Sequence, residues 1–369
     1  METNTRVAYD SALRRWVGIG PYYAMFPTAF AQRVIKKYTS TGDVVLDPFS
    51  GRGTAVFAAA ALDRHGIGIE INPVGYVYTR AKLRPARRGA VERRIAELAA
   101  NAWRFRKAAQ ELPTFFKRCY APVIREFLLT ARSWLDWRQS QIDCTVMALL
   151  LVHLHGKRID SFSNQMRQTK AMSPPYAIRW WDERGFEPPD LDPVGFMAKK
   201  LRWRYAKGRP RLPQNRVFLG DSVCRLGHVT RSLCSLGVEN VRLLLTSPPY
   251  CGVTNYHYDQ WLRLWLLGGP PTPTAPVGPR QGKFVDRAAY ADMLQSTFTA
   301  AAKLLAPDAI VYVRTDSRKT TLRATIEALN VAFPSKKMRK YKKPFPDRTQ
   351  TNLFGGESGE GGEVDLVLT

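Results

Sequence analysis

The sequence predicts an α/β protein with a mixed, mostly parallel sheet, helices on both faces of that sheet, and an inserted, mainly helical domain. Two observations carry this prediction. Apolar runs at 43–46 and 241–245 each end in a loop rich in glycine or proline, as strands of an open α/β sheet do. The segment 85–215 between them has helical spacing and a strong positive charge. We therefore expect residues 1–84 and 216–369 to form one domain and residues 85–215 to form the insert.

The elements of the first domain follow one another as a βαβ unit does. After an irregular start and a proline-bounded aromatic turn at 21–27, the spacing of apolar residues predicts a helix at 28–38. A strand at 43–47, an alanine-rich helix at 54–62 and a strand at 66–70 complete the unit. After the insert we expect, in order, strands at 217–219 and 241–245, helices at 258–267 and 288–305, and strands at 308–313 and 363–368.

The insert is predicted to be helical in its first part and rich in turns in its second. Helical patterns lie at 91–110, 123–135 and 142–155, and later proline pairs mark the turns. Residues 80–211 hold 28 Lys and Arg against 12 Asp and Glu, a net charge of +16, together with six of the nine tryptophans. This segment therefore carries most of the positive charge of the chain.

Composition limits the class of protein. The net charge of +25 and the pI near 10.1 favour a polyanionic partner, and nucleic acid is the natural candidate. The five cysteines form no Cys-x-x-Cys pair, which argues against a structural zinc site or a disulfide framework and favours a reducing, cytoplasmic compartment. No apolar run reaches the roughly 18 residues of a membrane span, and no signal peptide is evident, so we expect no membrane partner.

The first motif, Asp-Pro-Phe-Ser-Gly-Arg-Gly-Thr, starts at Asp47, where the first predicted strand ends. Gly51 and Gly53 suit a backbone that passes close to a ligand, and the next helix offers free N–H groups. A dinucleotide site is the alternative, but its fingerprint requires a third glycine where Val56 stands. Glu70 ends the next strand, at about the place where an acid grips ribose hydroxyls in Rossmann-like sites.

The second motif, Thr-Ser-Pro-Pro-Tyr, starts at Thr246 after the run at 241–245. One chemistry that this loop could support is the activation of an aromatic amine. Such an amine is a poor nucleophile because its lone pair is delocalised into the ring. Ser247 Oγ and the Pro248 carbonyl can accept hydrogen bonds from such an amine and favour a pyramidal nitrogen. The prolines carry no N–H that would compete, and Tyr250 can stack on a flipped-out base.

Together the two motifs resemble those of DNA amino-methyltransferases, and the Ser-Pro-Pro-Tyr form is most typical of the N4-cytosine type. The resemblance spans about residues 20–80 and 216–315 and does not cover the insert. It implies a Rossmann-like AdoMet-dependent methyltransferase fold, S-adenosylmethionine (AdoMet) as cofactor with S-adenosylhomocysteine as product, and no metal. Asp47 would lie near the methionine ammonium, and Asp221 would accept from the adenine amine. The implied cofactor-binding residues are Tyr23, Met25, Pro27, Asp47, Pro48, Phe49, Gly51, Gly53, Thr54, Glu70, Asn72, Asp221 and Ser222.

The resemblance implies a site-specific DNA methyltransferase that modifies the exocyclic N4 amine of a flipped-out cytosine, in a restriction-modification context. Its implied catalytic residues are Ser247, Pro248, Pro249 and Tyr250. Double-stranded DNA would be the partner, with a cognate endonuclease as a second one, in a bacterial or archaeal cytosol. The alternatives are adenine N6 methylation, RNA base methylation, and nucleic-acid binding without catalysis.

The chain departs from the family in the order of its two motifs and in the place of its insert. In the commonest N4-cytosine enzymes the catalytic segment precedes the AdoMet segment, and here the order is reversed. The insert is also not in the usual place of a target-recognition domain. These departures leave open which residues recognise the target, while the expected chemistry is unchanged.

Three other features suggest chemistry less strongly. Cys251 could indicate carbon-5 cytosine methylation, but in that family the cysteine directly follows a proline, and here Tyr250 stands between them. A second Ser-Pro-Pro-Tyr at 173–176 follows no predicted strand, so we expect a turn in the insert. His153 and His155 do not share a helix face, so a metal pair is not expected.

Overall fold

The computed structural model describes residues 10–21, 26–212, 214–252, 255–274, 284, 286–344 and 362–369. These residues form two compact units. Unit 1 takes its described residues from Met1–Pro21, Arg80–Pro213 and Gln260–Pro273, and unit 2 takes them from Tyr22–Thr79, Gln214–Asp259 and Thr274–Thr369. Unit 1 therefore includes two segments outside the expected insert, one at each side of it in the sequence.

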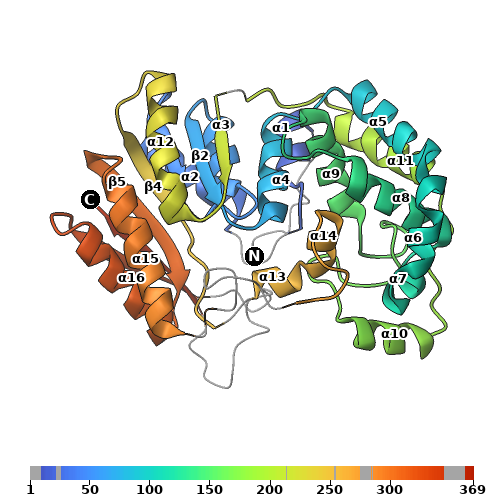
Figure 1. The fold of residues 1–369 in the computed structure, drawn as a ribbon. Coiled ribbons are helices and arrows are strands. Elements are labelled where there is room, and N and C mark those ends of the chain that lie inside the picture. Colours follow the sequence, from blue (N-terminus) through green and yellow to red (C-terminus); the bar gives the residue numbers. More distant parts are fainter. Residues whose placement is uncertain are drawn as a thin grey trace, which may run out of the picture. The chain divides into compact units, whose positions relative to one another are not determined.

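Unit 2 is built on a seven-stranded sheet in the order β3-β2-β1-β4-β5-β7-β6 (Figure 1). Its strands are β1 (Val44–Asp47), β2 (His65–Glu70), β3 (Arg216–Leu219), β4 (Val241–Thr246), β5 (Leu305–Asp316), β6 (Met338–Pro344) and β7 (Gly362–Leu368). Strand β7 runs opposite to the other six strands of this sheet, which are parallel to one another. The mixed, mostly parallel sheet confirms the predicted Rossmann-like α/β fold.

Helices cover both faces of this sheet because its central strands are apolar on both sides. Val44 and Leu46 of β1 belong to one core, and Val45 between them belongs to the other. The first core is closed by α12 (Ser222–Leu236), α15 (Arg287–Ala302) and α16 (Lys319–Ala332), and the second by α2 (Thr28–Tyr38) and α3 (Thr54–Ala60). Unit 2 also holds α13 (Tyr256–Asp259) and the first part of α4 (Pro73–Leu83).

The described part of unit 1 is helical. Its helices are α1 (Ala12–Val17), the rest of α4, α5 (Arg88–Ala100), the 3-10 helix η1 (Ala102–Phe105), α6 (Arg106–Glu111), α7 (Thr114–Cys119), α8 (Pro122–Trp134), α9 (Gln141–His153), α10 (Pro174–Asp182), α11 (Pro193–Tyr205) and α14 (Trp261–Leu266). Hydrogen bonds explain why α14 joins this unit: the Trp261 indole donates to the Met172 carbonyl at 3.2 Å, and buried Arg263 donates to the Leu151 carbonyl at 3.0 Å.

The expected helix at 28–38 and the strands β1 to β4 are confirmed to within one residue. Seven helices and one strand were not expected: α1, α4, α7, α10, α11, α12, α16 and β6. The expected turn at Pro174-Pro175 is wrong, because both prolines lie in the first turn of α10, where a helix needs no proline N–H. Strand β6 lacks an apolar alternation because it is an edge strand whose Arg339, Lys340 and Lys342 are exposed.

In the described part of the chain, no helix combines the length and the hydropathy needed to cross a membrane.

Candidate active site

The two sequence motifs meet where the order of the sheet changes direction. Strands β1 and β4 are parallel neighbours, with Leu46 paired to Leu244, so their carboxyl ends lie at the same edge. There Thr246 Oγ1 donates a hydrogen bond of 2.6 Å to Asp47 Oδ1, across 199 residues of sequence. The loop after β1 and the Ser-Pro-Pro-Tyr loop after β4 therefore start side by side, at the edge where open α/β sheets bind ligands.

Asp47 is a buried carboxylate whose described hydrogen bonds both end on one oxygen. Its side chain is 2% exposed, and Oδ1 accepts from Thr246 and from the Phe49 backbone N–H at 3.1 Å. Burial raises the pKa of Asp47 from 3.8 to about 7, while these two hydrogen bonds act in the opposite direction. A nearby cation would stabilise the ionised form, so the electrostatics favour a positively charged ligand group.

The glycine loop is packed closely on α4. Gly53 has a φ of +73° and precedes α3, and a Cβ atom there would lie 2.3 Å from Thr79 Cγ2. A Cβ atom on Gly75 would lie 2.4 Å from the Gly51 carbonyl oxygen. Thr54 is buried as the first residue of α3. Close packing and a left-handed backbone thus require glycine at these positions.

Glu70 holds the glycine loop from the end of β2. Its Oε2 accepts from the Gly51 N–H at 2.6 Å, and its Oε1 accepts from the Asn72 N–H at 2.8 Å. Asn72 Oδ1 in turn accepts from the Val74 N–H at 2.9 Å, at the start of α4. The expected role of Glu70 at a ribose stays a prediction, and the structure adds a role in fixing the loop.

The remaining expected cofactor residues lie around the same loop. Asp221 caps α12 by accepting from the Val223 N–H at 2.9 Å, and the Ser222 hydroxyl donates to the Pro48 carbonyl. The Phe49 ring packs edge-on against Phe298 in the core. Pro27 is the N-cap of α2. Tyr23 and Met25 lie outside the described residues, so their expected contacts stay predictions.

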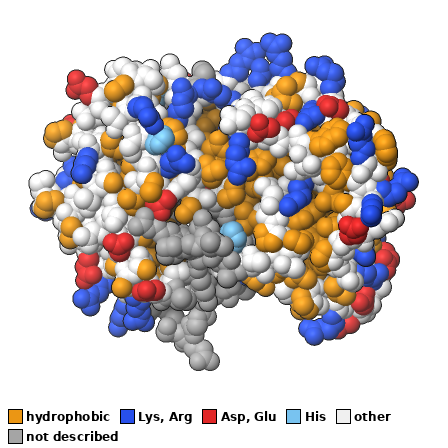
Figure 2. All heavy atoms as spheres, in the orientation of Figure 1, with side chains coloured by type: hydrophobic (Ala, Val, Ile, Leu, Met, Phe, Trp, Pro, Cys, Tyr) orange, Lys and Arg blue, Asp and Glu red, His pale blue; other side chains and the backbone are white. Residues whose placement is uncertain are grey.

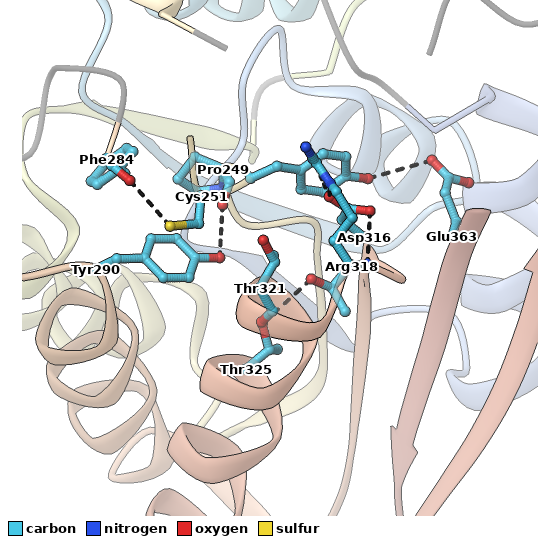
Figure 3. Close-up of polar contacts among 11 residues, drawn as sticks. Pro249, Cys251, Phe284, Tyr290, Asp316, Arg318, Thr321, Thr325 and Glu363 are labelled. Atoms are coloured by element: carbon cyan, nitrogen blue, oxygen red, sulfur yellow. Dashed lines mark hydrogen bonds and ion pairs between the residues drawn. The ribbon is translucent and has the colours of Figure 1, made fainter. Parts of the chain in front are cut away.

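Two residues that the sequence did not single out hold the Ser-Pro-Pro-Tyr loop (Figure 3). The Tyr290 hydroxyl on α15 donates to the Pro249 carbonyl at 2.9 Å, and the Tyr250 hydroxyl lies 3.5 Å from Glu363 Oε1 on β7. Tyr250 is 4% exposed. Ser247, directly after β4, is partly exposed. The loop is therefore held firmly at its third residue, Pro249, and more weakly at its fourth, Tyr250.

Glu363 belongs to a buried charged network on β5 and β7. Arg314 lies 3.2 Å from Glu363, and it donates to both oxygens of Asp365 at 2.7 and 2.9 Å. The Arg314 guanidinium also stacks on Phe30 of α2, 3.6 Å from the ring centroid. Burial raises the pKa of Glu363, whereas Arg314 lowers it. In the sequence, the only sign of this network was a pair of acids two residues apart in a predicted strand.

The weaker candidates have ordinary packing roles. The Cys251 thiol donates to the Phe284 carbonyl at 3.1 Å, and burial raises its pKa, which disfavours the thiolate nucleophile (Figure 3). Burial lowers the pKa of His153 to about 3, and also that of His155. Each imidazole has its Nδ1 within hydrogen-bond distance of a backbone carbonyl. The second Ser-Pro-Pro-Tyr starts α10, in unit 1.

Comparison with known proteins finds similarity over short parts of the chain. A family model described as DNA methylase, of the N6/N4 type, matches residues 3–79. The Type II methyltransferase M.HpaI of Haemophilus parainfluenzae is 46% identical over 52 residues, which are 14% of this chain and 17% of that protein. The Type II methyltransferase M.Cfr9I of Citrobacter freundii is 44% identical over 54 residues, 15% of this chain and 18% of that protein. Each match thus spans less than a fifth of the relative.

Among solved structures, an rRNA methyltransferase, aviRa, of Streptomyces viridochromogenes aligns with 98% of this chain and 94% of its own. The TM-score is 0.35 and the sequence identity is 13%, so this likeness supports no statement about function. The family model that bears on function matches the N-terminal fifth of the chain. That segment, which contains β1, the glycine loop and β2, is similar to DNA methylases of the N6/N4 type.

Proposed function

We propose that this chain is an AdoMet-dependent DNA methyltransferase that modifies the exocyclic N4 amine of cytosine. The observation that carries the proposal is the hydrogen bond between Thr246 and Asp47, which starts the catalytic loop beside the glycine loop. A methyl donor held by one loop and an amine held by the other would then be neighbours. Positioning of two reactants in this way supplies much of the rate acceleration in such a transfer.

The residues at the end of β1 fit S-adenosylmethionine. When bound, this cofactor supplies an electrophilic methyl group on a sulfonium. Asp47 would hold its methionine ammonium, because a buried carboxylate with a pKa of about 7 gains most from a cation. Glu70, at the end of β2, would hold the ribose, and Asp221, just after β3, would hold the adenine amine. Gly51 would leave room for the ligand beside the backbone, and Gly53 would hold the loop in shape through its packing on Thr79.

The residues at the end of β4 fit an exocyclic amine. Ser247 Oγ and the Pro248 carbonyl would accept the two amine hydrogens and leave the nitrogen lone pair directed at the methyl group. Pro248 and Pro249 have no N–H, so no backbone donor competes for that lone pair. No strong general base is required, because the methylated ammonium loses its proton readily. The choice of cytosine rests on the Ser-Pro-Pro-Tyr sequence.

Tyr250 would stack on the flipped-out base. Its ring is buried, so stacking requires that the ring turn toward the base. The contact to Glu363 is 3.5 Å long, at the limit of a hydrogen bond, and would break at small cost. Tyr290 keeps its bond to the Pro249 carbonyl and so would hold the rest of the loop while Tyr250 moves.

Double-stranded DNA is the proposed substrate, and the basic segment 85–215 is proposed to bind it and recognise the target. The net charge of +16 over residues 80–211 supports this assignment. The short matches to Type II methyltransferases support a restriction-modification context. A cognate endonuclease would then be a second partner.

The experiment compares nucleosides from DNA incubated with AdoMet and either the wild type, Ser247→Ala or Ser173→Ala. The Ser173 variant is a matched control because it changes the same residue in the second Ser-Pro-Pro-Tyr, at the start of α10. Mass spectrometry should detect N4-methylcytosine with the wild type and with Ser173→Ala. Ser247→Ala should lose at least about a hundredfold in turnover, as expected for a lost transition-state contact, and should retain AdoMet affinity.

Other outcomes identify the alternatives. N6-methyladenine in the wild-type sample would keep the site and overturn the choice of base. Methylated RNA without methylated DNA would overturn the substrate. If Ser247→Ala lost AdoMet binding as well as turnover, the role assigned to Ser247 would be wrong. Absence of any modified nucleoside, with AdoMet binding intact, would favour a nucleic-acid-binding protein without catalysis.

A further inference from the structure

Two short basic segments of unit 1, far apart in the sequence, are fastened side by side. They are Arg-Pro-Ala-Arg-Arg at 84–88 and Lys-Gly-Arg-Pro-Arg at 207–211, here called the paired basic segments. The Tyr205 hydroxyl donates to the Ala86 carbonyl at 2.8 Å, and Arg209 donates to the Pro85 carbonyl at 2.6 Å. The Leu212 N–H bonds to the Leu83 carbonyl at 3.3 Å. Six of these ten residues are Arg or Lys, and none is acidic.

The first segment is fixed from its other side by α9. Gln141 Nε2 donates to the Arg84 carbonyl at 2.5 Å, and the Ala86 N–H donates to Thr145 Oγ1 at 3.0 Å. Each segment also contains a proline, which restricts its backbone. The two segments are therefore a rigid part of unit 1 and not free basic tails.

Three of the six cations are exposed and have no neutralising contact. Arg87, Lys207 and Arg211 are exposed, and none of their side chains has a hydrogen-bond or ion-pair partner among the described residues. Arg87 precedes α5 without capping it through its side chain. Arg88 is paired with Glu92, an acid of α5 that lies outside both segments. Figure 2 shows Lys and Arg side chains gathered at the upper edge of this view, near the start of α5.

Like charges that are held close together repel one another, and this repulsion opposes folding. A bound ligand of the opposite charge would offset it. On an ordinary solvated surface, long cationic side chains can move apart. Here the hydrogen bonds between the two segments keep the Cα atoms of these cationic residues close together. Exposed guanidinium groups suit phosphate oxygens, which they can bind with two parallel hydrogen bonds. The arrangement thus fits a polymer with phosphates at regular intervals.

We propose that the paired basic segments bind the phosphate backbone of double-stranded DNA. This inference rests on the proposed function and adds the surface through which the insert grips its substrate. Arg87, Lys207 and Arg211 carry the contact. Phosphate contacts position a protein on the duplex and carry no sequence information, so this surface strengthens binding to all sequences alike.

The test uses the full chain and a fluorescein-labelled duplex of 30 base pairs, with dissociation constants measured by anisotropy over a range of salt concentrations. The test variant combines Arg87→Gln, Lys207→Gln and Arg211→Gln. The matched control removes three exposed charges outside the segment 85–215, by Arg33→Gln, Lys303→Gln and Arg339→Gln. A third variant, Arg87→Lys with Arg211→Lys, keeps the charge. Circular dichroism and AdoMet affinity check that each variant is folded.

Each phosphate contact adds about 0.9 to the slope of log affinity against log salt, so the test variant should lose about 2 to 3 from this slope. Its affinity near 0.1 M salt should fall about tenfold or more. The matched control and the charge-retaining variant should stay within about threefold of the wild type. AdoMet affinity should be unchanged in all of them.

The outcomes separate this inference from the proposed function. A wild type that binds DNA, with equal slopes for the test variant and the matched control, would overturn the surface and leave the enzyme assignment intact. A wild type that binds no duplex DNA would overturn both. Tenfold preference for duplex RNA over duplex DNA would also refute the occupant proposed for this surface.

Discussion

Replacing Asp47 with Asn tests whether this buried carboxylate serves a ligand at the expense of stability. Burial raises the pKa of Asp47 from 3.8 to about 7, so the unfolded chain releases this proton at much lower pH than the folded chain. At about 1.4 kcal/mol for each tenfold difference, the ionised carboxylate costs at most about 4 kcal/mol of folding free energy. The cost is absent below pH 4, grows as the pH rises, and is complete above pH 7.

Asparagine removes this cost while keeping the local contacts. Its side-chain oxygen can accept the same hydrogen bonds from Thr246 and Phe49 that Asp47 accepts. We therefore expect Asp47→Asn to raise the free energy of unfolding by about 2 to 4 kcal/mol at pH 8 in the absence of AdoMet. The gain should shrink to about 2 kcal/mol or less at pH 5, where the folded wild type is already protonated.

Urea unfolding at the two pH values measures the gain, and calorimetric titration measures AdoMet affinity. Wild-type affinity should rise between pH 6 and pH 7.5, as Asp47 loses its proton and can pair with the ligand ammonium. Asp47→Asn should bind AdoMet at least about a hundredfold more weakly, as expected for a lost buried charge pair, and without that rise. A variant that is less stable than the wild type at pH 8, or that binds AdoMet equally well, would refute this reasoning.

Three further predictions follow from the same geometry. Gly53→Ala should lower the free energy of unfolding, measured with urea, by at least about 2 kcal/mol, because φ is +73° and the added Cβ meets Thr79. Adding Thr79→Ala should recover only the part of this loss that is due to the clash. Arg314→Met should lower the free energy of unfolding by about 3 to 5 kcal/mol in the same assay, because buried Asp365 and partly buried Glu363 lose their cation; a smaller loss would mean that the pair is solvated. Tyr290→Phe should lower kcat several-fold with AdoMet affinity unchanged, since it frees the Pro249 carbonyl; unchanged kcat would rule out a positioning role.

The sequence by itself determined the fold class and the places of the two motifs. Apolar runs such as 43–46 and 241–245 are buried on both sides of the sheet, so their pattern is local and readable. The helix at 28–38 was predicted correctly because its apolar face repeats at helical spacing. Helix α10 was missed because Pro174 and Pro175 indicate a turn unless one knows that a helix starts there.

Only the tertiary structure decided which residues support the predicted site. Strand β1 lies beside β4, so Thr246 reaches Asp47 across 199 residues, and no local pattern encodes that distance. The same holds for Tyr290 at the catalytic loop, and for the two basic segments that unit 1 holds together. Periodicity reports what a residue shares with its near neighbours in the sequence. A hydrogen bond between distant segments depends on strand order and on helix packing, which exist only once the chain has folded.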